Sequence, residues 1–195
     1  YEDRFFLARS VSEAEIVVYG FAIKLASILG LALLPFQAAW TPLALSIKDQ
    51  PQAKSVYTRT MLYFLAGSLG LGLALSLYSH EATLILSNAT YLGARDLIWL
   101  LVMMPISAPF HYVVLIGLYI TQRVGLMSWS VVVAMIVNTV LNIVLIPHWG
   151  IMGAAAATGA AYALAPVATA IIAQRIYPLP FAWGRAALIA AGYIG

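Results

Sequence analysis

Five polar side chains stand inside long apolar stretches of the sequence, and their types and spacing are suited to chemistry: Lys24, Gln37, His111, Asn138 and Asn142. Lys24 lies about eight residues, or roughly 12 Å of helix, into the first stretch. An ammonium group at that depth is costly, and such groups usually face a bundle interior or a water-filled cavity. We therefore interpret Lys24 as a cavity cation that attracts an anionic substrate such as a phosphate. The alternative is a lysine that reaches back to the interface or pairs with a carboxylate elsewhere.

His111 lies in the middle of another apolar stretch and follows two prolines, Pro105 and Pro109. Imidazole titrates near neutral pH, so one interpretation is a proton-coupled switch. The alternative is a packing residue whose ring bonds to backbone carbonyls that a proline kink leaves exposed. Both interpretations place His111 inside a helical bundle.

Asn138 and Asn142 are four residues apart, which places them on one face of a helix. Amides in this arrangement commonly bond neighbouring helices, at about 0.6 kcal/mol per contact, and they also suit the lining of a substrate path. Gln37 stands near Trp40 in a stretch bracketed by two prolines, so it lines a bent helix or marks a membrane interface. The residues predicted to pack closely or to act as hinges are Pro35, Pro42, Gly67, Pro105, Pro109 and Gly153.

The composition of the chain excludes the soluble classes of protein. Of the 195 residues, 63% are hydrophobic and 9% are charged, and the mean hydropathy is +0.94. Soluble domains carry about 25% charged residues. We therefore exclude a cytosolic enzyme, a disordered tail and a nucleic-acid-binding module, despite the net charge of +3.

The apolar stretches are long enough for transmembrane helices, which need about 20 residues each. Their uniform apolarity favours helices over barrel strands, whose residues alternate. We predict an all-α, polytopic membrane helix bundle that forms a single transmembrane domain over residues 1–195. The predicted spans are about 16–47, 55–78, 97–121, 126–146 and 151–173, with a truncated sixth at 181–195.

The basic residues of the loops predict which side faces the cytoplasm. With alternating crossings, one side holds Lys48, Lys54, Arg59, Arg123, Arg175 and Arg185. The opposite side holds Arg4, Arg9 and Arg95 together with most of the acidic residues. We therefore predict a multi-pass protein of the bacterial cytoplasmic (inner) membrane, with the loops at 48–54, 122–125 and 174–185 on the cytoplasmic side.

The sequence lacks the groups that membrane enzymes use. It contains no cysteine, and Asp and Glu are absent from the centres of the five complete spans. Paired carboxylates, metal-ligand spacings, a nucleophile elbow and a glycine-rich phosphate loop are not seen. We therefore expect no enzymatic activity, no catalytic residues, no cofactor and no metal site.

The fourth and fifth predicted spans carry a motif that resembles a known family. Residues 138–155, NTVLNIVLIPHWGIMGAA, are similar to the pattern N-x-x-L-N-x-x-L-I-P-x-x-G-x-x-G-A-A of polysaccharide exporters. These are the Wzx-type O-antigen and capsule flippases of the MATE/MOP superfamily. Shorter similarities follow in the same order along nearly the whole chain, at Asp3-Arg4, 18–25 (VYGFAIKL), 36–42 (FQAAWTP) and 91–94 (YLGA).

The resemblance implies a fold and a transport activity. The chain would be the second of two six-helix bundles, and a missing N-terminal half of the same chain would supply the first. The bundles would rock around a cationic cavity and export undecaprenyl-pyrophosphate-linked oligosaccharides for O-antigen, capsule or exopolysaccharide, with membrane lipid around them. Lys24 would contact the lipid pyrophosphate.

Two points stay open within the resemblance. The coupling ion is a proton or sodium, and no central acidic residue identifies its site. The alternatives from the same superfamily are a peptidoglycan-precursor flippase and a MATE-type cation or drug antiporter. The antiporter is expected to carry a central carboxylate for its cationic substrate.

Overall fold

The computed structural model describes residues 2–180 together with residues 184, 188 and 192. All secondary structure in this part of the chain is helical, so the all-α prediction is confirmed there. The predicted sixth span at 181–195 lies mostly outside the described residues. The elements are α1 (Glu2–Leu7), α2 (Glu13–Ser46), α3 (Ala53–Leu77), α4 (Ser79–Leu86), η1 (Ala89–Ala94), α5 (Arg95–Leu101), α6 (Met103–Ile120), η2 (Val124–Leu126) and α7 (Met127–Ile176).

Four helical segments in the described residues are long and apolar enough to cross a membrane: Glu13–Ser46, Ala53–Leu77, Ala89–Ile120 and Ser128–Ile176. The first two agree closely with the predicted spans 16–47 and 55–78. The third joins η1, α5 and α6 and covers the predicted span 97–121 except for its last residue. The fourth is α7, which covers the predicted span 126–146 except for its first residue and the whole of the predicted span 151–173.

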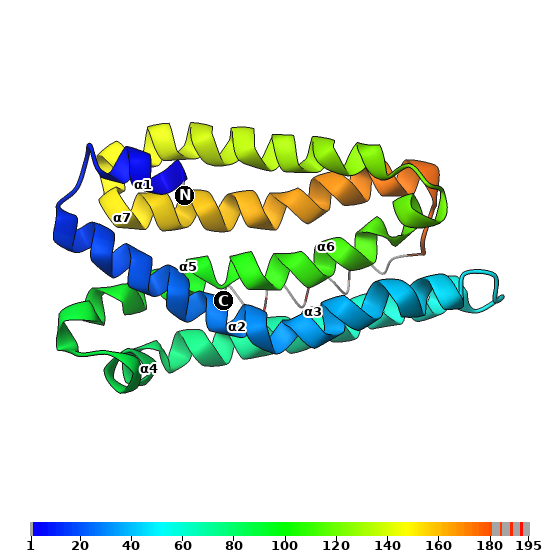
Figure 1. Ribbon diagram of the computed structural model, residues 1–195, viewed down its shortest axis with the longest axis horizontal. Helices are drawn as coiled ribbons and strands as arrows, with labels where there is room; N and C mark the ends of the chain where they lie inside the picture. Colours follow the sequence, from blue (N-terminus) through cyan, green and yellow to red (C-terminus); the bar gives the residue numbers. More distant parts are fainter. Residues whose placement is uncertain (1, 181–183, 185–187, 189–191, 193–195) are drawn as a thin grey trace.

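Helix α7 reverses direction at a single glycine. Gly150 has φ of 52° and ψ of −130°, a conformation that costs glycine little and other residues more. The two halves of α7 therefore run side by side and antiparallel (Figure 1). Gly153 lies where the halves meet, because a Cβ there would clash with the Leu145 carbonyl. The loop expected at 147–150 is thus reduced to one non-helical residue.

Helix α6 lies at the centre of the bundle, between the α7 hairpin and the pair formed by α2 and α3 (Figure 1). Helix α2 begins with a capping box, in which the Ser12 and Glu15 side chains each bond to the other residue's backbone N–H. Pro35 and Pro42 both lie inside α2, which stays continuous through them. Pro105 and Pro109 lie inside α6.

The glycines predicted to pack closely behave differently from one another. No atom among the described residues lies within 4 Å of a Cβ built on Gly67, which is exposed. Gly72, further along α3, is buried, and a Cβ there would lie 2.6 Å from the Ile106 side chain of α6. The close approach of α3 to α6 is therefore at Gly72, because Gly67 faces outward.

Two apolar cores hold the bundle together. One lies at the end near the Gly150 reversal and contains Leu7, Tyr19, Leu97 and Ile146. The other lies toward the 48–54 turn and is rich in aromatic rings. There Trp40 meets Tyr57 edge to face at 5.8 Å, and Phe36 stacks at 3.7 Å between centroids on Phe64, which packs against the first core.

The outer surface of the bundle is apolar as well. Trp129 and Trp149, near the two ends of the first half of α7, are 63% and 60% exposed. Their separation in sequence corresponds to about 30 Å of helix, the thickness of a hydrocarbon core. Tryptophan is common at both membrane–water interfaces, so this half of α7 has the features of a lipid-facing span.

Candidate functional site

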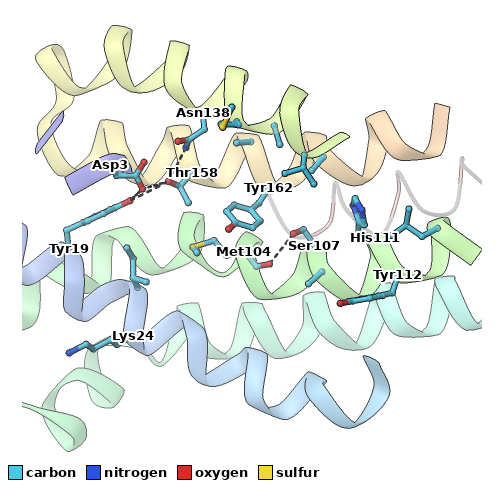
Figure 2. A pocket seen from close by; sticks show the side chains of 18 of the residues that line it. Asp3, Tyr19, Lys24, Met104, Ser107, His111, Tyr112, Asn138, Thr158 and Tyr162 are labelled. Carbon is cyan, nitrogen blue, oxygen red and sulfur yellow. Dashed lines mark hydrogen bonds between the residues drawn. The ribbon is translucent and has the colours of Figure 1, made fainter. Parts of the chain in front are cut away.

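A cavity of about 970 Å³, called the main cavity below, lies between α2, α6 and α7. Its walls are mostly apolar, and its polar side chains come from all three helices and from α1 (Figure 2). This volume is at the upper end of the range for small-molecule sites. The polar and aromatic residues that line it are Asp3, Tyr19, Lys24, Ser107, His111, Tyr112, Tyr119, Asn138, Thr158 and Tyr162.

One carboxylate collects hydrogen bonds at the edge of the main cavity. Asp3 Oδ2 accepts from the Tyr19 hydroxyl at 2.8 Å and from the Thr158 hydroxyl at 2.9 Å. Asp3 Oδ1 accepts from Asn142 Nδ2 at 2.6 Å. Asn138 joins the group, because its Oδ1 accepts from Asn142 Nδ2 at 3.0 Å and its Nδ2 lies 3.4 Å from Thr158 Oγ1. We call these five residues the Asp3 cluster.

The reversal of α7 assembles much of this cluster. Asn142 precedes Gly150 by as many residues as Thr158 follows it, so the antiparallel halves bring the two to a similar level. Asn138 lies one turn from Asn142 on the same face. The carboxylate arrives from outside α7, on the short helix α1, which packs against it.

Asn142 holds a fixed orientation in the cluster. Its side chain is completely buried, and both amide hydrogens are used by the oxygens of Asp3 and Asn138. A flipped amide would place oxygen against the carboxylate, so the assignment of Oδ1 is settled by its neighbours. Asn142 Oδ1 has no hydrogen-bond partner among the described residues.

Asn142 does not line the main cavity and instead lines a smaller one. This second cavity has a volume of about 230 Å³ and lies between the α1 region and the first half of α7. We call it the small cavity. Its lining residues are Phe6, Ser10, Asn142, Ile143, Ile146 and Pro147.

Lys24, predicted to be a cavity cation, is among the residues that line the main cavity, and its side chain is exposed. Its ammonium group points away from Tyr19 and Asn138 (Figure 2). The aliphatic stem therefore forms part of the wall while the charge extends toward the surface, an arrangement common for lysine.

His111 also lines the main cavity, on α6. It is half-buried, and its Nδ1 lies 3.5 Å from the Thr169 hydroxyl, at the limit of a hydrogen bond. Gln37 is half-buried on α2 and does not line either cavity. The structure thus brings Lys24, His111 and Asn138 to one cavity, places Asn142 just behind it, and leaves Gln37 apart.

Three members of the Asp3 cluster were missed from the sequence as site residues: Asp3, Tyr19 and Thr158. Asp3 lies outside the five complete predicted spans, whose centres contain no Asp or Glu. The asparagine pair could have indicated these residues, because two buried amides on one helix face require polar partners. Thr158 is the polar residue that faces the pair across the reversal of α7.

The donor set of the Asp3 cluster suits a small, hard cation. It offers a carboxylate, two amide oxygens and two hydroxyls, and hard cations prefer oxygen ligands. Among the described residues no group of three or more His, Asp or Glu side chains is positioned to hold a metal ion, so a site built from several charged ligands is not formed there. A proton or a monovalent cation fits the single negative charge of Asp3.

Comparisons of the chain with known proteins do not assign it to a family. No family model, curated protein or solved structure matches it.

Proposed function

We propose that this chain belongs to a bacterial inner-membrane transporter that moves lipid-linked oligosaccharides by alternating access. The observation that carries the proposal is the main cavity, which is large, mostly apolar and lined by helices long enough to cross a membrane. The resemblance of residues 138–155 to the polysaccharide exporters supplies the substrate class, an oligosaccharide on undecaprenyl pyrophosphate. The fold expected from that resemblance is the second bundle of a MATE/MOP exporter.

Lys24 is the cation proposed to contact the pyrophosphate. Its stem lines the cavity and its ammonium extends outward, so it would meet the substrate at the cavity mouth. A flexible lysine head can follow a phosphate over several ångströms, whereas a fixed ion pair cannot. The rings of His111, Tyr112 and Tyr119, further along the same cavity, would face the saccharide.

The Asp3 cluster is proposed as the site of the coupling ion. Its carboxylate comes from α1 and reaches the cavity wall, while the three donors to it come from α2 and from both halves of α7. A cation bound there competes for the carboxylate with three hydrogen-bond donors on different helices. Binding and release therefore favour different arrangements of these helices, which is the requirement for coupling to a change of state.

The test is complementation of a strain that lacks the gene. We expect the deletion to accumulate lipid-linked repeat units and to lose surface glycan, and the wild-type gene to restore it. Lys24→Ala should fail to restore the glycan while still inserting into the membrane, and Lys48→Ala is the matched control because that lysine is exposed in a turn. Normal surface glycan in the deletion strain would disprove the proposal.

A second candidate function is favoured by one observation. Asp3 lines the main cavity, and a carboxylate at that place is what a cation or drug antiporter of the same superfamily needs. The same deletion strain separates the two functions. If surface glycan is unchanged and sensitivity to cationic drugs rises, the antiporter is supported instead.

A further inference from the structure

The two cavities meet at the Asp3 cluster. Asp3, Asn138 and Thr158 line the main cavity, whereas Asn142 lines the small cavity. Asn142 donates directly to both Asp3 and Asn138. The Asp3 cluster therefore lies between the main cavity and the small cavity, and the side-chain amide of Asn142 connects the two.

The small cavity extends from the surface to the Asp3 cluster. At its outer side Ser10, Ile143 and Pro147 are exposed, and on its inner side Asn142 is completely buried. Asn142 carries on its Oδ1 a buried acceptor that has no hydrogen-bond partner among the described residues. A buried acceptor without a partner is costly, so a cation that reaches Asn142 would gain from an oxygen to which no donor of the described residues bonds.

We infer that the small cavity is the route by which a small cation, a proton or sodium, reaches the Asp3 cluster, separately from the path of the larger substrate. This inference rests on the proposed function of the cluster. A volume of about 230 Å³ admits a few water molecules, each of which occupies about 30 Å³. An oligosaccharide does not fit there, and the apolar walls formed by Phe6, Ile143 and Ile146 offer it few hydrogen bonds.

The location of the small cavity gives the route a direction. It lies beside the Gly150 reversal, where a Cβ on Gly150 would lie 3.3 Å from Val11. The distribution of basic residues predicts that this end of the bundle is extracytoplasmic. The cation would then enter from outside the cell whichever way the main cavity faces, so cation binding and substrate binding are not in competition for one opening.

Single cysteines test whether the small cavity holds water. These 195 residues contain no cysteine, so an introduced thiol is unique within them. Ile143→Cys lines the small cavity, and Val144→Cys is the matched control, next to it and about equally exposed at 53% against 57%. The full-length protein in vesicles of known orientation is treated from the extracytoplasmic side with a charged, membrane-impermeant methanethiosulfonate reagent.

We expect Ile143→Cys to react at least about tenfold faster than Val144→Cys, because only a hydrated thiol ionises readily to the reactive thiolate. Equal rates at the two positions would overturn the inference. In the second stage, modified Ile143→Cys should lose cation-driven transport while unmodified Ile143→Cys retains it. Full cation-driven transport after complete modification would also overturn it.

Further measurements identify the cation and test the cation route independently of the proposed oligosaccharide transport. Added sodium should slow the modification of Ile143→Cys if sodium is the ion, and a pH gradient alone should drive transport if a proton is. Transport is read with lipid-linked oligosaccharide and with a cationic drug. If modification blocks drug transport and the oligosaccharide is never moved, the route stands and the flippase function fails.

Discussion

The two ends of the bundle are held together by different kinds of contact. Near the Gly150 reversal, three donors from three segments of the chain converge on the Asp3 carboxylate. Toward the 48–54 turn, the helices are joined by aromatic rings, with Trp40 and Tyr57 at the centre. The Asp3 end depends on directional hydrogen bonds to a charged group, and the aromatic end depends on the packing of buried apolar surface.

This difference indicates which end of the bundle rearranges during transport and which end keeps the helices together. Apolar packing is lost only by separating surfaces, whereas a carboxylate can exchange its donors for a bound cation without a large movement. We therefore expect the aromatic end to govern stability and the Asp3 end to govern transport. Substitutions at the two ends should separate these two properties.

The largest expected effect on stability is at the aromatic end. Trp40 is buried and its Nε1 donates to the Tyr112 carbonyl on α6 at 3.2 Å. Trp40→Ala should lower the free energy of unfolding by about 3–5 kcal/mol, measured by thermal unfolding in detergent. Trp129→Ala, at an exposed site, is the control and should change it little. Trp40→Ala should retain transport per folded molecule. Loss of that transport would contradict the expectation that the aromatic end governs stability alone.

Asp3→Asn comes next in its effect on stability and first in its effect on transport. The three groups that face Asp3 all donate, so an amide nitrogen at this place would face a donor. We expect a loss of about 2 kcal/mol, typical of hydrogen bonds to a charged group, and loss of cation-driven transport. Asp96→Asn is the control, because its ion pair with Arg95 is exposed and such pairs contribute little. Normal transport by Asp3→Asn would remove the Asp3 cluster from the mechanism.

The helices were predictable because burial in a bilayer imposes a local requirement on the sequence. The predicted spans 16–47 and 55–78 agree with α2 and α3 to within a few residues. Likewise, the spacing of Asn138 and Asn142 was enough to place both amides on one face. Such features repeat within one or two helical turns, so they can be recognised from neighbouring residues alone.

The Asp3 cluster was not predictable in the same way. The contact of Asp3 with Asn142 joins residues 139 positions apart, and no local pattern connects them. Asp3 stands between Glu2 and Arg4, and an acidic side chain among charged neighbours usually faces water. Only the packing of α1 against α7 places it at a cavity, and that packing depends on the reversal at Gly150.

A matched pair of tyrosines gives a finer comparison of the two ends. The Tyr19 hydroxyl donates to Asp3 at 2.8 Å, and the Tyr57 hydroxyl donates to the Ala44 carbonyl at 2.6 Å. Each substitution to phenylalanine removes one buried hydroxyl, which should cost about 1 kcal/mol at Tyr57 and about 2 kcal/mol at Tyr19, whose acceptor is a carboxylate. We expect Tyr19→Phe to slow cation-driven transport and Tyr57→Phe to leave it unchanged at equal protein level. Equal transport by the two variants would show that transport depends no more on the Asp3 end than on the aromatic end.

The smallest expected effect is at the edge of the aromatic end. Lys54 Nζ lies 4.8 Å from the centroid of the Tyr177 ring, a cation–π contact that contributes about 0.5–1 kcal/mol at an exposed site. Lys54→Met keeps an apolar stem and removes the charge, so the unfolding temperature should fall slightly, while Lys48→Met should leave it unchanged. Tyr177 also packs on Gly117 of α6, where a Cβ would lie 2.8 Å from the Tyr177 Cβ. Because this contact joins α3 and α6 through the end of α7, a transport defect in Lys54→Met without a loss of stability would mean that the aromatic end moves as well.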